Sequence, residues 1–130
     1  YADTGISFLV GQGSETLTKL CKVAQQGTWN GLNQAITGNY LRNIGKAIQE
    51  TAADNGFTVI KNLAGHGTGK KLHEEPQVLN YEDRRDRRKL NQGLVLAIES
   101  FISTGSQVAY EENDGWTLVA GNFPNQSYVA

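Results

Sequence analysis

The chain has 130 residues, which points to one domain that is large enough to bury a core of its own. Its 12 Lys and Arg side chains against 13 Asp and Glu leave a formal net charge of -1, which excludes a strong overall field that would recruit nucleic acid or an anionic membrane. A single cysteine, Cys21, excludes an internal disulfide and fits a reducing cytoplasm, and no apolar run reaches the roughly 20 residues that span a bilayer.

The first ten residues carry apolar side chains at alternate positions, Ile6, Phe8 and Val10, and this period of two predicts a strand over residues 1–10. The chain opens on Tyr1, inside that pattern, and it contains no methionine at all. We therefore interpret it as a fragment or a processed chain.

Two helices are predicted after this strand. Ser14 stands where an N-cap is expected, ahead of a helix predicted over residues 16–36 with its apolar side chains on one face. Gly27 and Gly31 are expected to weaken the second half of this helix by about 1 kcal/mol each relative to alanine. A second amphipathic helix is predicted over residues 41–55.

The remaining elements are predicted to be extended. Leu94 to Phe101 is almost wholly apolar, which is typical of a buried central strand. The pair Asp114-Gly115 predicts the turn of a hairpin. The other expected strands are residues 57–62, residues 77–79, the two hairpin arms at 107–110 and 116–120, and the tail at 127–130.

Five basic residues and three acids make up the segment Glu82-Asp83-Arg84-Arg85-Asp86-Arg87-Arg88-Lys89. Basic clusters of this size can mark a nucleic-acid surface. The interleaved acids, and the absence of an aromatic residue among the arginines, favour a solvated loop instead. No specific nucleic-acid partner is therefore expected.

Glu99 is the one acidic or basic side chain inside the predicted central strand. A carboxylate in an apolar strand is costly unless it is paired or binds a cation. Two interpretations stay open: a buried ion pair or a strand end that reaches water, and a metal ligand or general base.

Both histidines lie in the stretch Gly65 to Pro76. Glycines on both sides of His66 let its backbone approach another group closely, which favours a ligand over a surface histidine. His73 misses the i,i+4 spacing of helical zinc sites, so a contact with substrate or support of a ligand is expected for it. Asp3, His66 and Glu99 together form a mixed carboxylate and imidazole set that suits Mn, Fe, Co or Zn.

Spacing disfavours two rival chemistries. A phosphate-binding loop of the form G-x-x-x-x-G-K-S/T needs a glycine and a hydroxyl where the chain has Ala64 and Lys71. The glycine run also misses the G-x-G-x-x-G spacing of dinucleotide sites. A cysteine nucleophile would have to be Cys21, which is expected to pack in the core from the apolar face of its helix.

The motif GHGTGKKLHEEPQVLNY at residues 65–81 resembles the type I methionine aminopeptidases of the creatinase and prolidase-like "pita-bread" superfamily. Three further segments carry the resemblance in the same order along the chain. They are YADTG at residues 1–5, LNQG at 90–93 with the apolar run to Glu99, and DGWT at 114–117. The continuation VLNY and the tryptophan of the hairpin favour the methionine branch over the proline dipeptidases.

The resemblance implies an α+β domain, a partial pita-bread fold with a mainly antiparallel sheet and two principal helices. It implies a hydrolase that uses two divalent metal ions to remove the N-terminal methionine from nascent polypeptides. His73 matches the catalytic histidine, which also contacts the substrate. The residues that the resemblance assigns to the site are Asp3, His66 and Glu99 for the metal, and His73, Trp116 and Leu72 for the substrate.

The resemblance also implies two further carboxylate ligands, one before Asp3 and one after Ala130, and the chain contains neither. Three ligands can hold one ion with an open position, so at most one metal is expected here. Ser100 stands where the family usually has proline. We expect residues 1–130 to form a single, truncated metalloaminopeptidase catalytic domain.

The expected function is a metal-dependent aminopeptidase of the cytoplasm that acts on nascent peptides and is weak or inactive as this chain alone. Association with the ribosome is a further expectation, and no membrane partner is expected. Two alternatives stay open: a non-catalytic module on the same fold that binds a peptide or protein, and an X-Pro dipeptidase-type relative.

Overall fold

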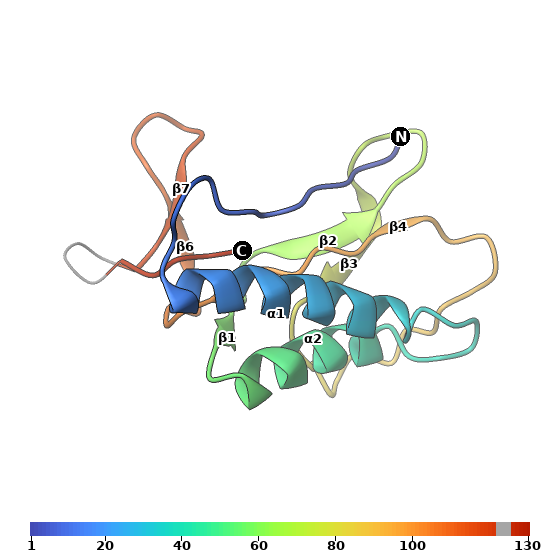
Figure 1. The fold of residues 1–130 in the computed structure, drawn as a ribbon. Coiled ribbons are helices and arrows are strands. Elements are labelled where there is room, and N and C mark those ends of the chain that lie inside the picture. Colours follow the sequence, from blue (N-terminus) through green and yellow to red (C-terminus); the bar gives the residue numbers. More distant parts are fainter. Residues whose placement is uncertain (122–125) are drawn as a thin grey trace.

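The computed structural model describes residues 1–121 and 126–130. Within these residues, two neighbouring helices lie along one side of a group of short antiparallel strands (Figure 1). The elements are α1 (Glu15–Leu32), α2 (Arg42–Asp54), β1 (Thr58–Val59), β2 (Ala64–Gly67), β3 (Glu74–Leu79), β4 (Leu96–Ala97), β5 (Ile102–Ser103), β6 (Ala109–Glu111) and β7 (Leu118–Ala120). The predicted α+β class, with two principal helices and antiparallel strand pairs, is confirmed.

Helix α1 begins where the sequence predicts. Ser14 has extended backbone angles, and its Oγ accepts a hydrogen bond of 3.3 Å from the backbone N–H of Leu17. The helix ends at Leu32 and not at Ile36, because the following amides turn back to carbonyls three residues earlier. Helix α2 matches its prediction to within one residue at each end.

The two glycines of α1 are the points where its neighbours come closest. A Cβ atom at Gly31 would lie 3.1 Å from Ile48 Cγ1 and 3.3 Å from Ile44 Cγ2, both on α2. A Cβ atom at Gly27 would lie 3.1 Å from Ile102 Cδ1 on β5. These glycines therefore lower helix propensity and at the same time permit the close packing of α1 against α2 and β5.

The main core fills the space between the helices and the strands. It is made of buried aliphatic side chains from both helices, from β1, β3 and β5, and from the loops before α2 and β4. They are Leu20, Val23, Ala24, Leu41, Ile44, Ile48, Ala52, Val59, Val78, Leu90 and Ile102.

Strand β2 lies in the middle of a three-stranded sheet of order β3-β2-β4. Gly65 pairs with Val78 of β3, and His66 pairs with Ala97 of β4. The register with β3 shifts between Gly65 and Gly67, so β2 is irregular at His66. The predicted strand 77–79 is thus the end of a longer strand, and the glycine-rich stretch itself contains a strand.

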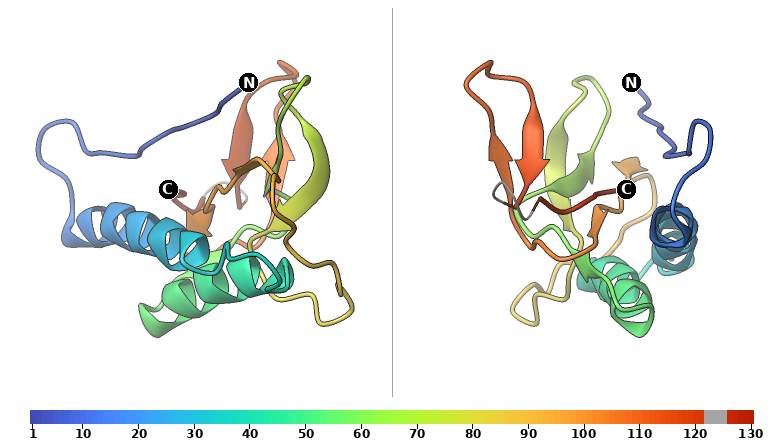
Figure 2. Two further views of the ribbon diagram at one scale, coloured as in Figure 1. Left: turned by 90° about the vertical axis from the view of Figure 1, so that its right-hand side faces the viewer. Right: turned by 60° about the vertical axis from the view of Figure 1, so that its left-hand side comes forward.

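The prediction of a strand over residues 1–10 is wrong for this structure. The segment has no regular secondary structure, and Ile6, Phe8 and Val10 are 72%, 73% and 89% exposed. Its start lies beside the loop between β2 and β3, where the N-terminal amine of Tyr1 donates to the carbonyl of Gly69 at 3.0 Å, and it then runs back to α1 (Figures 1 and 2). A strand forms only where a partner edge accepts its backbone, and no described segment of the chain pairs with this one.

The predicted central strand 94–101 is also shorter than expected. Only Leu96 and Ala97 join the β2 ladder, and Leu94 and Val95 are 42% and 57% exposed. An apolar run predicts burial but does not fix a partner, and here the chain leaves one sheet and enters another as β5. The strand predicted at 57–62 is only β1, and the tail 127–130 makes isolated bridges in place of a strand.

The hairpin prediction is confirmed, because β6 and β7 pair antiparallel with Ala109 opposite Ala120. Residues 82–89 form a loop, as predicted. No helix of the described residues is long and apolar enough to cross a membrane.

Candidate metal centre

His66 is held tightly in the middle of the β2 sheet. A Cβ atom at Gly65 would run into the carbonyl oxygen of Ala97, and one at Gly67 would run into that of Glu75. The close approach expected from the flanking glycines is therefore present, and the groups that approach are the backbones of the two neighbouring strands. The imidazole between them is buried.

The orientation of the His66 ring follows from one backbone hydrogen bond. Its Nδ1 lies 2.9 Å from the carbonyl oxygen of Gly67. Because a carbonyl only accepts, Nδ1 carries the hydrogen, and the neutral ring presents its Nε2 lone pair on the other side. That lone pair is aimed at two carboxylates, at 3.3 Å from Glu99 Oε1 and 3.9 Å from Asp3 Oδ2.

Three segments that are distant in sequence supply this cluster. His66 comes from β2, Glu99 follows β4 by two residues, and Asp3 comes from the irregular N-terminal segment. One ligand atom from each side chain lies within 4.8 Å of the others. A neutral nitrogen lone pair between two acids is electrostatically unfavourable unless a proton or a cation lies between them. The donor set therefore fits a divalent metal ion.

The electrostatics of Glu99 agree with this arrangement. Burial raises the pKa of its carboxyl, and the nearby charge of Asp3 raises it further, while His66 acts in the opposite direction. The side chain is 31% exposed, so the buried position expected from the apolar run is only partial. Glu99 consequently reaches both the imidazole and solvent, as an ion that enters from solution requires.

The structure places His73 beside this cluster. Its ring centroid lies 4.3 Å from that of His66, with the two planes tilted by 55°. His73 is exposed, in the loop between β2 and β3. Leu72 lies in the same loop and is 38% exposed. Of these two residues, His73 is the one that contacts the ring of His66.

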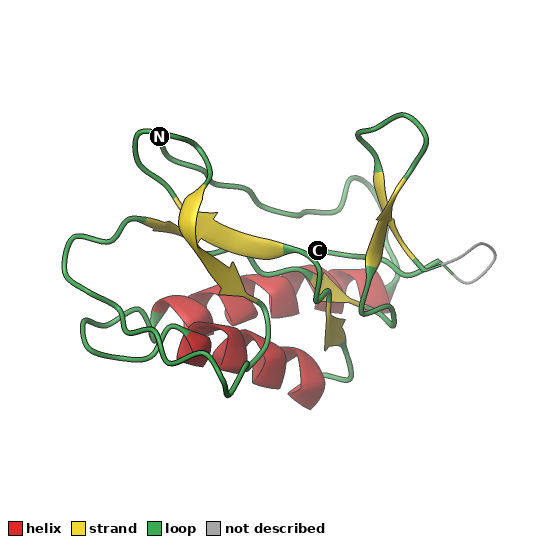
Figure 3. Ribbon diagram, turned by 180° about the vertical axis from the view of Figure 1, so that it is seen from behind, coloured by secondary structure: helices red, strands yellow, loops and turns green. Residues whose placement is uncertain are grey.

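Trp116 lies elsewhere in the fold. It is 88% exposed in the turn that joins β6 to β7. Figures 1 and 3 show the tip of this hairpin well apart from the loop between β2 and β3. The structure therefore brings Asp3, His66, Glu99 and His73 together and does not bring Trp116 to them.

Two polar side chains to which the sequence analysis assigned no role join segments around the cluster. Asn80 is fully buried; its Nδ2 donates to the carbonyl of Leu63 at 3.0 Å, and its Oδ1 accepts from the N–H of Phe101 at 3.2 Å. It therefore joins the approach to β2 to the segment after Glu99. Ser100 is the second of these side chains, and its hydroxyl bonds to α1. The sequence signals were that Asn80 lies within the motif at 65–81 and that Ser100 directly follows Glu99, where the family usually has proline.

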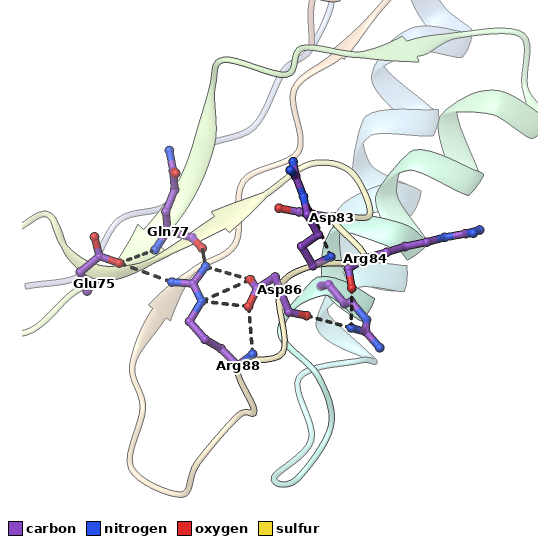
Figure 4. A network of polar contacts seen from close by, with 8 residues as sticks. Glu75, Gln77, Asp83, Arg84, Asp86 and Arg88 are labelled. Atoms are coloured by element: carbon purple, nitrogen blue, oxygen red, sulfur yellow. Dashed lines mark hydrogen bonds and ion pairs between the residues drawn. The ribbon is translucent and has the colours of Figure 1, made fainter.

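A network of charged side chains supports the outer strand, β3 (Figure 4). Arg88 forms a 2.8 Å ion pair with Asp86 and reaches Glu75 at 3.5 Å and the carbonyl of Gln77 at 3.4 Å. The Arg88 guanidinium holds the pKa of Asp86 below its ordinary value. The charged loop is thus solvated on one side, where Arg85 is 95% exposed, and tied to β3 on the other.

Comparisons with known proteins agree with this geometry. A family model described as "Metallopeptidase family M24" matches residues 1–121. "Methionine aminopeptidase 2" of Bacillus subtilis is 46% identical over 131 residues, which is 100% of this chain and 51% of that protein. The methionine aminopeptidase of Staphylococcus epidermidis is also 46% identical, over 132 residues, with the same two coverages.

A comparison of folds also finds methionine aminopeptidases. The crystal structure of a methionine aminopeptidase from Thermotoga maritima matches with a TM-score of 0.86 and 32% sequence identity, over 94% of this chain and 48% of that one. The fold implied by the sequence resemblance is therefore confirmed. The chain spans about half the length of the curated relatives that it matches.

Proposed function

Because this chain belongs to the metallopeptidase family M24, we propose that it supplies part of the metal centre of an aminopeptidase that removes the N-terminal methionine from nascent polypeptides. The observation that carries the proposal is the convergence of Asp3, His66 and Glu99, whose ligand atoms lie within 4.8 Å of one another. The reaction comes from the names of the relatives, which are methionine aminopeptidases. Residues 1–130 are proposed to act as one catalytic unit.

In this proposal, His66 Nε2 and the carboxylates of Asp3 and Glu99 hold one divalent ion of the Mn, Fe, Co or Zn type. Three protein donors leave a coordination position open, so these residues are proposed to hold one ion. When bound, such an ion polarises the scissile carbonyl and makes a water molecule more acidic. The Gly67 carbonyl can only accept a hydrogen bond from Nδ1, so Nε2 is the ring nitrogen proposed to bind the ion.

His73 is the proposed catalytic residue. Its exposed imidazole stands next to His66, where it can hold a proton and donate a hydrogen bond to the substrate carbonyl. Leu72 offers an apolar contact in the same loop, which suits a methionine side chain. Trp116 is proposed to contact the substrate at a distance from the cluster, from the exposed hairpin turn.

The proposal includes the partner and the location. The substrate is a nascent peptide with N-terminal methionine, so the proposed location is the cytoplasm and the proposed association is with the ribosome, where such termini first emerge. A cytoplasmic location also suits the single cysteine.

The experiment measures bound metal and released methionine together. Two proteins are compared: this chain, and the chain extended at both ends to the length of its relatives. For each, the number of Co or Mn ions bound per chain and the release of methionine from a Met-Ala-Ser peptide are measured. His66→Ala should abolish metal binding, whereas His73→Ala should retain the metal and lose activity, since His73 is assigned to the substrate. No methionine release from the extended chain would overturn the proposal. Peptide binding without metal would support the non-catalytic module.

A further inference from the structure

Glu99 lies outside the regular strands, so something other than ladder hydrogen bonds must fix its position. Strand β4 ends at Ala97 and β5 begins at Ile102. In the extended segment between them, successive side chains point to opposite sides. Glu99 faces His66, while Ser100 and Ile102 face α1.

The contact between this segment and α1 is a cluster of two hydroxyls and one carbonyl. Ser100 Oγ lies 2.7 Å from Thr28 Oγ1 and donates to the carbonyl oxygen of Ala24 at 2.9 Å. Thr28 Oγ1 is also within 3.1 Å of that carbonyl. Gly27 lies next to Thr28, and its missing side chain lets Ile102 pack against the helix. The residue directly after Glu99 is thus bonded to the body of the fold.

The two hydroxyls differ in how much of the contact between this segment and α1 depends on them. Each hydroxyl has one hydrogen, so Ser100 either donates to Ala24 and accepts from Thr28, or donates to Thr28, which then donates to Ala24. Without the Thr28 hydroxyl, Ser100 still bonds to Ala24 directly. Without the Ser100 hydroxyl, both bonds between the segment and α1 are lost. Ser100 is therefore the essential member and Thr28 the supporting one.

We propose that Ser100, supported by Thr28, is a positioning residue that holds the Glu99 carboxylate against His66 for metal binding. The inference rests on the proposed function, because the metal is the ligand that this positioning serves. Glu99 Oε1 is 3.3 Å from His66 Nε2, and a shift of its backbone relative to α1 would change that distance and the direction of the carboxylate. Residues that orient metal ligands typically change metal affinity by about 10- to 100-fold when they are replaced.

The test compares Co²⁺ binding by the unaltered chain and by four variants, with Co²⁺ affinity and the visible absorption of bound Co²⁺ as readouts. Ser100→Ala should weaken Co²⁺ binding by about tenfold or more and should alter the absorption spectrum, which reports ligand geometry. Thr28→Val should have a smaller effect because the direct bond to Ala24 remains. Ser100→Thr keeps the hydroxyl and should bind like the unaltered chain.

Thr18→Val is the matched control. Thr18 makes the same type of bond within α1, to the carbonyl of Ser14 at 3.1 Å, but it lies in the first turns of the helix, away from the segment of Glu99. A stability effect common to lost helix hydroxyls would appear in both Thr18→Val and Thr28→Val, whereas a positioning effect appears only in Thr28→Val. Urea unfolding of each variant separates stability from affinity.

Equal affinity and an unchanged spectrum for Ser100→Ala would overturn the positioning role while leaving the proposed function intact. No Co²⁺ binding by the unaltered chain would overturn both. If Ser100→Ala fails to fold, Thr28→Val and Ser100→Thr decide the question, because a Thr28→Val variant that binds as tightly as Thr18→Val contradicts the proposal.

Discussion

The pair Asp86 and Arg88 allows a quantitative test of how the charged loop supports the β2 sheet. The Asp86 carboxylate is only 10% exposed and accepts from the backbone N–H of Arg88 at 2.9 Å, from its Nε at 3.0 Å and from its Nη2 at 2.8 Å. The same guanidinium bonds to the carbonyl of Gln77 on β3. Asp86→Asn removes the charge and keeps the shape of the side chain.

The expected magnitude follows from the burial of the two partners. Hydrogen bonds to charged groups contribute about 1.5–3 kcal/mol each. Arg88 is 47% exposed, so solvent screens the pair and reduces the expected coupling to about 1 kcal/mol. A double-mutant cycle of Asp86→Asn and Arg88→Gln, followed by urea unfolding, measures that coupling.

The coupling should depend on pH with a definite sign. Arg88 lowers the pKa of Asp86 in the folded chain from its ordinary value of 3.8. A carboxyl whose folded pKa is depressed stabilises the fold fully above its unfolded pKa, and the stabilisation is lost as the pH falls through the folded pKa. The difference between the unaltered chain and Asp86→Asn should therefore be constant from neutral pH down to about 5 and shrink below about 4.

A neighbouring pair with the same spacing provides the control. Asp83 and Arg85 form an ion pair of 3.5 Å, but Arg85 is 95% exposed. Asp83→Asn and Arg85→Gln should show no measurable coupling. Equal coupling in the two pairs, or an Asp86→Asn effect that persists undiminished to pH 3, would refute this explanation.

Three further predictions concern stability in urea or heat. Gly67→Ala should cost about 3 kcal/mol or more, because its Cβ would meet backbone at Glu75 that cannot rotate away, while Gly5→Ala, in open space, should change nothing. Asn80→Ala should cost about 2 kcal/mol by leaving a partly buried carbonyl at Leu63 and a partly buried N–H at Phe101 unpaired, and it should also weaken metal binding. Ser14→Ala should cost about 1 kcal/mol through loss of the N-cap of α1, measured as a lower urea midpoint. A Gly5→Ala loss as large as that of Gly67→Ala, or an Asn80→Ala variant as stable as the unaltered chain, would contradict these assignments.

The helices and the hairpin were predictable because their signals are local. Each signal involves residues within a few positions of one another: the N-cap Ser14, the apolar spacing of α2 and the Asp114-Gly115 turn. Strands need partners from elsewhere in the chain. Residues 1–10 have the period of a strand and form none, and the apolar run 94–101 joins a sheet only at Leu96 and Ala97. Periodicity shows which side chains would share one face of a strand, whereas strand pairing depends on whether another strand edge is available to accept the backbone.

The candidate site was predictable at the level of residue types. Carboxylates and imidazoles are the side chains that suit divalent ions of this kind. Asp3, His66 and Glu99 could therefore be named from the sequence and its resemblance to a family. The groups that orient them could not. The carbonyl of Gly67 sets the tautomer of His66, and any residue at that position would supply a carbonyl. The Gly67 carbonyl has this effect because of its position in the fold and not because of the residue type.

The glycines around His66 show how the structure can give a sequence feature a more specific role than the sequence suggests. The sequence predicted that they let the backbone approach another group closely, and the groups at their Cβ positions are the backbones of the neighbouring strands. The buried ring thereby lies on the strand between β3 and β4, with Nδ1 on the Gly67 carbonyl and Nε2 facing the two carboxylates. A mobile histidine could turn away from two carboxylates that repel its lone pair, whereas this one cannot. In the proposed metal site, the glycines contribute through rigidity, because folding holds the three electron-rich donors together before any ion arrives.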